Sequence, residues 1–380
     1  MELEAALARW QRHGGPAAAL DLLSAAQSSG AELPSRPDPK HDPARWRSFL
    51  DISSRSGFLS ALALPEHREA WSELALRAIA TVDLSLEDLL DQRVAEHPDR
   101  ALFVERGRTG RRDWTYLQIR RRVRSIAAAI LSRIGPGARV AIVADNGLEG
   151  ACADLACLLH DIVVSPLSVH FDSEAMEWIL RRLDATVVLA DTDDRIRKLL
   201  EIRQRSGADF EVWALRDGQN VERGVAPLLD AEAASLEPDR IETVLSKRPR
   251  LDLDEPCTVM FTSGSTGRPK GVVFSRRNLV TKRFARAAAL PSVGDDETLL
   301  CYLPLYHTFG RFLEMLGMLF WRGTYVFVGN PSADALLAGL TEIEPTGLIS
   351  IPLRWTQIRD RIVEAMDAAT TPEEREAQFR

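Results

Sequence analysis

Short apolar segments alternate with longer amphipathic ones through much of the chain, and this pattern limits the possible folds more than any other feature. Apolar runs at 139–144, 161–166 and 186–190 are separated by segments of helical length, and the alternation resumes over 298–368. Strands that are apolar on both faces are typical of parallel sheets covered by helices. The sequence therefore predicts an α/β fold with parallel sheets flanked by helices.

The same pattern predicts individual elements. Asp172 and Ser173 are expected to cap a helix over 174–183. A further helix over 86–96 is expected to open the main domain, which begins near Ser85. The elements expected downstream are strands at 298–303, 324–328 and 346–351 and helices at 309–321, 333–343 and 354–368.

Residues 1–80 are predicted to form a small helical extension with a proline-rich linker. Alanine and leucine dominate residues 1–30, and a break is expected at Gly14-Gly15-Pro16. The prolines that follow exclude a regular element and predict an extended linker: Pro34, Pro37, Pro39 and Pro43. From Pro65 onward, apolar residues recur at helical spacing to Val82 and predict a helix that packs against the main domain. A docked structural extension is favoured, and a protein-interaction module is the alternative.

The main domain is predicted to divide into two α/β subdomains, 81–245 and 246–380. The reason is that the composition between Glu222 and Pro249 changes to charged residues, alanines and prolines, which is typical of a junction.

Composition excludes several classes of protein. A net charge of -7 argues against nucleic-acid binding, for which a basic domain is expected. An arginine run at 120–124 suggests an anionic partner such as CoA, lipid or RNA, but a solvated helix face is the favoured interpretation. The N-terminus lacks the order of a signal peptide and no apolar run is long enough to cross a membrane, so a cytoplasmic location is expected and a peripheral membrane contact stays possible.

The four cysteines point to no disulfide and no zinc site. Each lies in an apolar run, where a small buried thiol is the common explanation, and the four have no paired spacing: Cys152, Cys157, Cys257 and Cys301.

One loop is suited to phosphate binding. It follows an apolar run at 257–261 and holds glycines, hydroxyl side chains and one lysine: Thr262, Ser263, Gly264, Ser265, Thr266, Gly267 and Lys270. Glycines let the backbone approach an anion, and successive N–H groups with hydroxyls donate to it. A Walker A motif does not fit, because Pro269 precedes the lysine and Gly271 follows it. A flexible turn is the alternative.

This loop, from Thr262 to Gly271, resembles the signature of the adenylate-forming superfamily, which includes acyl-CoA synthetases, luciferases and nonribosomal peptide adenylation domains. A second stretch, Tyr302-Leu303-Pro304-Leu305-Tyr306-His307-Thr308-Phe309-Gly310, resembles the next core motif of that family. With Arg311, Glu314 and Met315 it is similar to the fatty acyl-CoA synthetases of the longer-chain kind.

The resemblance implies a fold and a reaction. It implies the N-terminal domain of an adenylate-forming enzyme, with ATP, Mg²⁺ and CoA as co-substrates and cofactors and a small carboxylic acid as substrate. It assigns Thr262 through Gly267 and Lys270 to the triphosphate, and His307 to the acyl side of the active site as the candidate catalytic residue. No metal-ligating residue is assigned, and the oligomeric state stays open.

The reaction requires little general acid or base catalysis from the protein. A carboxylate is ionised at neutral pH and is its own nucleophile, so placement and charge neutralisation do the catalysis. The acyl-adenylate would then be attacked by the thiol of CoA. No Ser-His-Asp or Cys-His signature is found, and none is needed.

The resemblance covers about Ser85 to Arg380 and lacks the family's later motifs, including the Tyr-Gly-x-Thr-Glu segment and the C-terminal lysine domain. We therefore expect an incomplete ligase that is inactive alone. Two alternatives stay open: a non-catalytic nucleotide-binding or interaction module, and an acyl-AMP ligase that uses a carrier protein in place of CoA.

Overall fold

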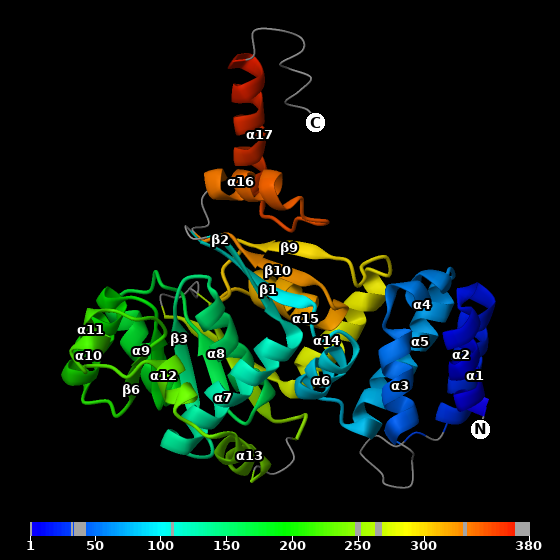
Figure 1. The fold of residues 1–380 in the computed structure, drawn as a ribbon, viewed down its shortest axis with the longest axis horizontal. Helices are drawn as coiled ribbons and strands as arrows, with labels where there is room; N and C mark the ends of the chain where they lie inside the picture. Colours follow the sequence, from blue (N-terminus) through cyan, green and yellow to red (C-terminus); the bar gives the residue numbers. More distant parts are fainter. Residues whose placement is uncertain are drawn as a thin grey trace.

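Two mixed β-sheets covered by helices form the body of the protein, and a group of N-terminal helices packs on one flank (Figure 1). The computed structural model describes residues 2–31, 33, 43–107, 110–247, 252–262, 268–329 and 333–368. The α/β architecture predicted from the sequence is confirmed, although neither sheet is purely parallel.

The larger sheet has six strands in the order β6-β5-β3-β4-β7-β8. Their bounds are β3 Arg139–Val143, β4 Val163–Pro166, β5 Val187–Ala190, β6 Glu211–Ala214, β7 Pro256–Thr262 and β8 Lys270–Ser275. All neighbours are parallel except β7 and β8, which form an antiparallel hairpin. The sequence predicted β3, β4, β5 and β7 near these bounds, but it did not predict β8.

The smaller sheet has four strands in the order β2-β1-β10-β9. Their bounds are β1 Ala101–Gly107, β2 Gly110–Thr115, β9 Thr298–Cys301 and β10 Thr324–Phe327. Strands β1, β10 and β9 are parallel, and β2 turns back antiparallel to β1.

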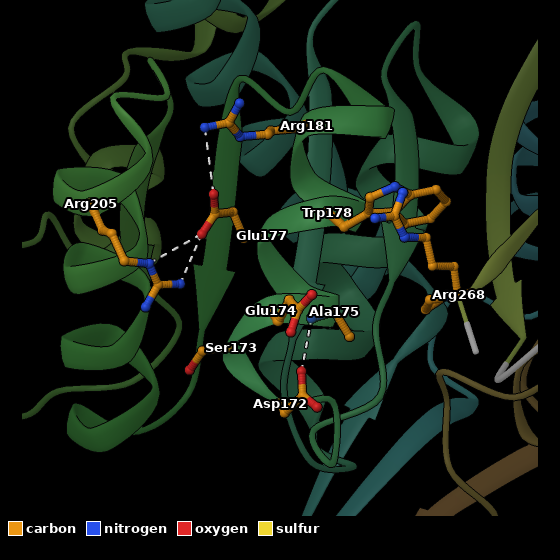
Figure 2. Close-up of a pocket in the computed structure, with 10 residues that line it drawn as sticks. Asp172, Ser173, Glu174, Ala175, Glu177, Trp178, Arg181, Arg205 and Arg268 are labelled. Atoms are coloured by element: carbon orange, nitrogen blue, oxygen red, sulfur yellow. Dashed lines mark hydrogen bonds and ion pairs between the residues drawn. The ribbon is translucent and has the colours of Figure 1, made fainter.

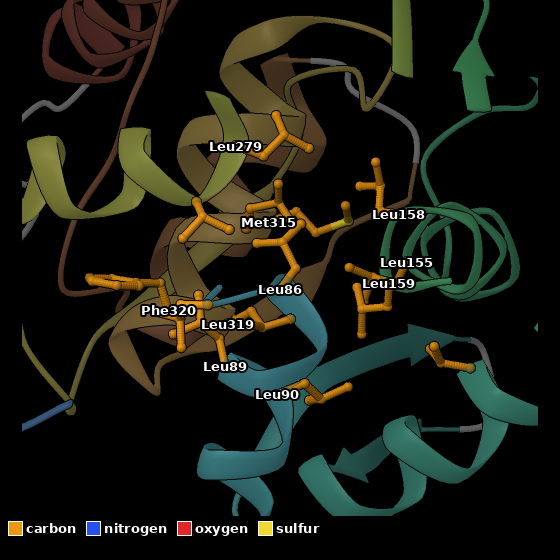
Figure 3. Packing of buried hydrophobic residues seen from close by; sticks show 14 of the residues in the cluster. Leu86, Leu89, Leu90, Leu155, Leu158, Leu159, Leu279, Met315, Leu319 and Phe320 are labelled. Carbon is orange, nitrogen blue, oxygen red and sulfur yellow. The ribbon is translucent and has the colours of Figure 1, made fainter. Parts of the chain in front are cut away.

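Helices cover both sheets. Those of the main body are α6 Leu86–Glu96, α7 Tyr116–Ile134, α8 Leu148–Leu159, α9 Ser173–Leu183, α10 Asp193–Ser206, α11 Gln219–Glu222, α12 Leu229–Ala234, α13 Pro238–Ser246, α14 Arg276–Ala289, η1 Phe309–Met315, α15 Leu316–Trp321, α16 Ala333–Ile343 and α17 Pro352–Ala368. The cap predicted for α9 is confirmed, because Oδ1 of Asp172 accepts from the N–H of Ala175 at 2.8 Å. Apolar side chains of α6, α8, α14 and the η1–α15 helix meet in one core (Figure 3).

The prediction of a strand at 346–351 is wrong. Residues 344–351 are irregular. The N–H of Thr346 donates to the carbonyl of Thr298 on β9 at 3.1 Å, but no ladder follows, and the carbonyl of Ile349 accepts from the Tyr302 hydroxyl at 2.6 Å. A strand needs successive backbone bonds, and here a side chain takes one of the acceptors.

The N-terminal extension contains more helix than predicted. Its helices are α1 Glu2–His13, α2 Gly15–Gly30, α3 Pro43–Ser53, α4 Ser56–Ala61 and α5 Pro65–Val82. The break at Gly14 and the helix from Pro65 agree with the prediction. Pro43 begins α3 instead of belonging to an extended linker, because proline fits the first helical position. The rest of the predicted linker, residues 34–42, lies outside the described residues.

The extension shares its core with the main body. Trp71 of α5 is buried with its ring centroid 6.3 Å from that of Phe284 on α14. The Ser60 hydroxyl donates to the carbonyl of Pro291 at 2.9 Å. One hydrophobic cluster runs from Leu3 through these residues to Phe327, so no solvent layer separates the two parts.

The subdomain boundary at residue 245 stays a prediction. Each sheet takes strands from both sides of that residue, and short helices α11, α12 and α13 occupy 219–246, where a loose junction was expected. Helices α12 and α13 pack on α7.

The arginine run on α7 makes intramolecular ion pairs. Arg120 pairs with Asp91, Arg122 with Asp230, and Arg124 with Glu87 and Glu242, so these three side chains are held by carboxylates of the chain instead of forming the solvated face that was favoured. Within the described ranges, no helix combines the length and apolar character that a membrane span requires.

Candidate active site

The candidate phosphate loop is carried by the β7–β8 hairpin. Thr262, the last residue of β7, is paired with Lys270, the first of β8. Thr262 and Lys270 are exposed, and Ser263, Gly264, Ser265, Thr266 and Gly267 lie outside the described residues. In the part of the chain that the structure describes, no carboxylate is paired with the Lys270 ammonium. The hairpin therefore presents an exposed lysine beside the ends of the loop.

The second motif, residues 302–310, follows β9 of the four-stranded sheet and runs toward the β7–β8 hairpin. Because β4 and β7 are parallel with Val164 opposite Thr258, the residues four positions further on, Ser168 and Thr262, emerge at the same edge. The Tyr306 phenol interacts with the Ser168 side chain, and burial raises the pKa of that phenol. Ligands in open α/β sheets bind beyond the carboxyl ends of parallel strands, which is where these residues meet.

Asn146, just after β3, holds the second motif in place. Its amide nitrogen donates to the carbonyl of Leu303 at 2.9 Å, and its amide oxygen accepts from the N–H of Leu305 at 3.0 Å. The backbone of Gly310 lies directly against the backbone of Leu303. A Cβ at this position would lie 2.5 Å from the Leu303 carbonyl oxygen, so a larger residue would not fit. The loop that carries His307 is thus fixed between the two sheets.

His307 itself is exposed and stacks on Phe309. Their ring centroids lie 6.1 Å apart with the planes 20° from parallel, and Phe309 is 47% exposed. The N–H of Arg311 donates to the carbonyl of His307 at 3.0 Å. An exposed aromatic pair at this edge offers an apolar wall with one titratable ring.

The predicted helix at 309–321 begins as a π-helix, η1, and continues as α15. Arg311 on η1 is fully buried and makes two bonds to Asp154 of α8, at 2.7 and 2.6 Å. It also donates to the Thr258 hydroxyl of β7 at 2.7 Å. Single π-turns inside helices are rare and occur often at functional sites. Arg311 therefore joins the His307 helix to the strand that carries the phosphate loop.

Two arginines of α14 contact η1: Arg283 is buried and Arg286 is only partly buried. Arg283 and Arg286 of α14 both donate to the carbonyl of Phe312. Burial, with Arg286 nearby, lowers the pKa of Arg283 well below its usual value. On another side of η1, the Tyr325 hydroxyl donates to Oε2 of Glu314 at 2.7 Å, and burial raises the pKa of Glu314 to about 8.

Glu314 should make the stability of the chain depend on pH. Its carboxyl is protonated in the folded chain up to about pH 8 but ionised in the unfolded chain above about pH 4.5, so its contribution to stability falls as pH rises between these values. Glu314→Gln keeps an acceptor for Tyr325 and should remove this fall, which is on the order of a few kcal/mol. Denaturant unfolding of both chains at pH 6 and pH 9 measures it. An equal loss of stability between pH 6 and pH 9 in the unaltered chain and in Glu314→Gln would contradict the prediction.

Two open hollows flank the hairpin. One, of about 740 Å³, is lined by Arg268, Pro269 and residues of α9 and α10; in it, Glu177 pairs with both Arg181 and Arg205 (Figure 2). The other, of about 670 Å³, lies over the α9 side of the hairpin. It is lined by Arg139, Val163, Trp178, Arg182, Leu183, Pro256, Val259, Phe261, Arg268, Pro269, Lys270, Gly271 and Val273. The second hollow is lined by four cationic side chains and no acidic one. Arg139 already pairs with Asp184, so Arg182, Arg268 and Lys270 are the cations that suit an anionic ligand beside the loop.

The structure therefore brings Thr262, Lys270 and the His307 segment to one edge of the six-stranded sheet. Sequence reasoning missed Arg268, Trp178 and Arg182 beside the hairpin, because their positions depend on how α9 packs. It also missed the contacts of Arg311 with Asp154 and Thr258. An arginine four residues after His307, on the helix expected over 309–321, was the available signal.

This arrangement places the chain in a known class. A model of the AMP-binding enzyme family matches residues 90–378, so the chain belongs to that family. The helical extension lies outside the matched residues.

Curated relatives of the chain include long-chain fatty acid ligases. The chain is 31% identical over 246 residues to the long-chain-fatty-acid–CoA ligase FadD15 of Mycobacterium bovis, an alignment that covers 63% of this chain and 39% of that protein. It is 25% identical over 262 residues to human long-chain-fatty-acid–CoA ligase 1, covering 66% of this chain and 37% of that protein. The chain thus spans about two fifths of the length of the curated relatives that it matches.

Solved structures agree on the fold. The N-terminal domain of FACL13 from Mycobacterium tuberculosis superposes with a TM-score of 0.61 at 20% identity, over 76% of this chain and 66% of that one. ATP-bound MatB from Rhodopseudomonas palustris gives a TM-score of 0.58 at 21% identity, over 72% of this chain and 51% of that one.

Proposed function

We propose that these residues belong to an enzyme that joins a carboxylic acid to ATP, giving an acyl-adenylate and pyrophosphate, and then transfers the acyl group to CoA. The acid proposed is a medium- or long-chain fatty acid. The observation that carries the proposal is the hairpin that places Thr262 and Lys270 at one sheet edge with the His307 segment. Membership of the AMP-binding family and the fatty acid ligases among its relatives support it.

In this proposal the β7–β8 loop binds the triphosphate. Thr262, Ser263, Gly264, Ser265, Thr266 and Gly267 would donate N–H and hydroxyl groups, and Lys270 would neutralise charge that develops on pyrophosphate. Mg²⁺ would share that charge. Among the described residues no group of three or more His, Cys, Asp or Glu side chains could hold a metal ion, and we assign no protein ligand to Mg²⁺.

His307 is proposed to act on the acyl side. Its ring stacks on Phe309 next to the sheet edge, where the pair can bound the channel for an apolar acid. A bound acid would lie between this wall and the phosphate loop, with its carboxylate directed at the α-phosphorus.

The chain covers about two fifths of its curated relatives, so the activity is proposed for the protein to which these residues belong. We propose that the 380 residues alone do not complete the reaction. Three further points stay predictions. They are a cytoplasmic location, a peripheral contact with membranes, and the use of CoA rather than a carrier protein as the acyl acceptor.

Fatty-acid-dependent exchange of labelled pyrophosphate into ATP tests the first half-reaction. The longest natural form should catalyse the exchange, and thioester formation with CoA or with a phosphopantetheinyl carrier protein identifies the acceptor. Absence of exchange across acids of several chain lengths would favour a non-catalytic nucleotide-binding module instead.

Lys270→Ala should weaken the use of ATP by about 1–3 kcal/mol, the scale for losing one charged contact with a ligand. The measurement is kcat/KM for ATP in the exchange reaction of the longest form. Lys282→Ala on α14 is the control, because Lys282 is also exposed and α14 begins after Ser275, at the end of the hairpin opposite the loop. Unchanged kinetics in Lys270→Ala would remove this lysine from the phosphate site.

A further inference from the structure

Asp51, on helix α3 of the extension, contacts three arginines. Its Oδ1 lies 2.6 Å from Nη1 of Arg93 and 2.7 Å from Nη2 of Arg322, and its Oδ2 lies 2.8 Å from Nη2 of Arg55. Arg93 and Arg322 belong to the part of the chain that matches the AMP-binding family, whereas Asp51 lies before it. The extension thus supplies a carboxylate to two guanidinium groups of the main body.

These two guanidinium groups are deeply buried. The Arg93 side chain is 0% exposed and that of Arg322 is 2% exposed. Glu96 is the second nearby carboxylate, with Oε2 2.7 Å from Nε of Arg322. Burial alone would raise the pKa of Asp51, but Arg93 and Arg322 hold it well below its usual range. Without Asp51, the two buried cations would keep Glu96 and the more distant Asp295, which lies 4.0 Å from Nη1 of Arg322. A buried charge that loses a close partner is strongly unfavourable.

Both arginines hold the carboxyl end of helix α15. Nε of Arg93 donates to the carbonyl of Phe320 at 3.1 Å. Arg322 is the C-cap residue of α15, in the left-handed conformation with φ of 68°. The last carbonyls of a helix have no partner within the helix, so Arg93 satisfies one of them. Asp51 orients the Arg93 guanidinium that makes this bond.

The other end of the same helix carries the acyl-side segment. Helices η1 and α15 run without interruption from Phe309 to Trp321, a length of somewhat under about 20 Å, because a π-helix rises less per residue than the 1.5 Å of an α-helix. Gly310 closes the amino end against Leu303, and Met315, Leu319 and Phe320 pack on α6 along its length (Figure 3). The carboxyl end is thus connected by continuous packing to the end next to His307 and Phe309, which Asn146 and Arg311 also hold.

We propose that Asp51 is a positioning residue: from the N-terminal extension, it fixes the carboxyl end of the η1–α15 helix through Arg93 and Arg322, and so sets the position of His307 and Phe309. Its effect on the reaction rests on the proposed function, but its effect on the helix does not. The extension then acts as part of the acyl-side machinery through contacts within the chain.

The test uses the charge-balanced variant Asp51→Asn/Arg93→Met in the whole chain. It removes one buried anion and one buried cation together, so the cost of an unpaired charge is avoided. Amide hydrogen exchange at 316–323, followed by mass spectrometry without ATP or acid, should be about tenfold faster than in the unaltered chain, because the end of the helix opens locally. Exchange in β3 and β5 should not change, which separates local opening from global unfolding.

Arg47→Met is the matched control. Arg47 lies on the same helix α3 and pairs with Asp88 of α6 at 2.7 Å, so it ties the extension to the main body without touching α15. The control should leave exchange at 316–323 unchanged. Unchanged exchange in the charge-balanced variant, or equal acceleration in the control, would overturn the proposal. If the double variant does not fold, Asp51→Glu should give a smaller acceleration at the same amides, and none would overturn the proposal.

A kinetic readout addresses the acyl side. In the pyrophosphate exchange of the longest form, the charge-balanced variant should raise KM for the acid about tenfold while KM for ATP stays the same, because misplacement affects only the acyl wall. Equal changes in both constants would contradict the positioning role. Absence of exchange in the unaltered enzyme would refute the proposed function alone, and the hydrogen-exchange result would still decide whether Asp51 holds the helix.

Discussion

Arg311→Met is expected to destabilise the chain by about 3–5 kcal/mol, the cost of leaving one partner of a buried ion pair uncompensated. The Asp154 side chain is 4% exposed and makes two of its bonds to Arg311. Without the guanidinium, that carboxylate would lose its partner in the core, whereas the Thr258 hydroxyl would still donate to the carbonyl of Val164. Chemical denaturation of the unaltered and variant chains at pH 7 gives the difference.

The double variant Asp154→Leu/Arg311→Met is the control for this prediction. Replacing a whole buried pair by apolar side chains is often neutral, so the double variant should recover most of the lost stability. Arg359→Met, which breaks an exposed pair with Asp360, should change stability by less than about 1 kcal/mol. A single variant as stable as the double one would show that the pair contributes no net charge compensation.

Removal of residues 2–82 is expected to prevent folding of the remainder. The deletion exposes a face of α14 that includes Val280 and Phe284 and is now covered by Trp71 and its neighbours. It also leaves Arg93 and Arg322 without Asp51. Each large apolar side chain returned to water costs about 1.5–3 kcal/mol, and whole domains are stable by only about 5–15 kcal/mol. The shortened chain should aggregate on expression.

Solubility and a cooperative melting curve measure this outcome. A shortened chain that starts at residue 83, stays soluble and melts cooperatively near the temperature of the whole chain would show that the main body is stable without the extension. Deleting only α1, Glu2–His13, is the milder comparison, because its buried residues Leu3, Ala6 and Leu7 contact other extension helices. That variant should stay folded with a lower midpoint.

The sequence predicted the parts of the fold that depend on local patterns. Runs such as 139–144 and 186–190 are apolar on both faces, and only a strand covered on both sides satisfies them, so β3 and β5 were found close to their observed bounds. The Asp172 cap is also a local signal, because it needs only the next few residues.

Features that depend on distant partners were not predictable. Segment 346–351 has strand-like composition, but whether it completes a ladder depends on β9 and on the Tyr302 hydroxyl. The π-turn in η1 coincides with bonds from Arg283, Arg286 and Arg311, whose partners are far away in the sequence. For the candidate site, the motif residues could be predicted but the cations around them could not, since Arg182 is brought to the hairpin only by the packing of α9.

The side-chain amide of Asn146 links the two sheets, and this amide is chemically labile. It serves as donor to Leu303 and as acceptor from Leu305, and it is followed directly by Gly147. Asparagine is among the thermolabile residues of proteins. Hydrolysis of this amide to aspartate would replace the donor by an oxygen that faces the Leu303 carbonyl oxygen, and the contact would become repulsive. Slow chemical damage during heating or storage would then loosen the loop that carries His307 before it unfolds either sheet.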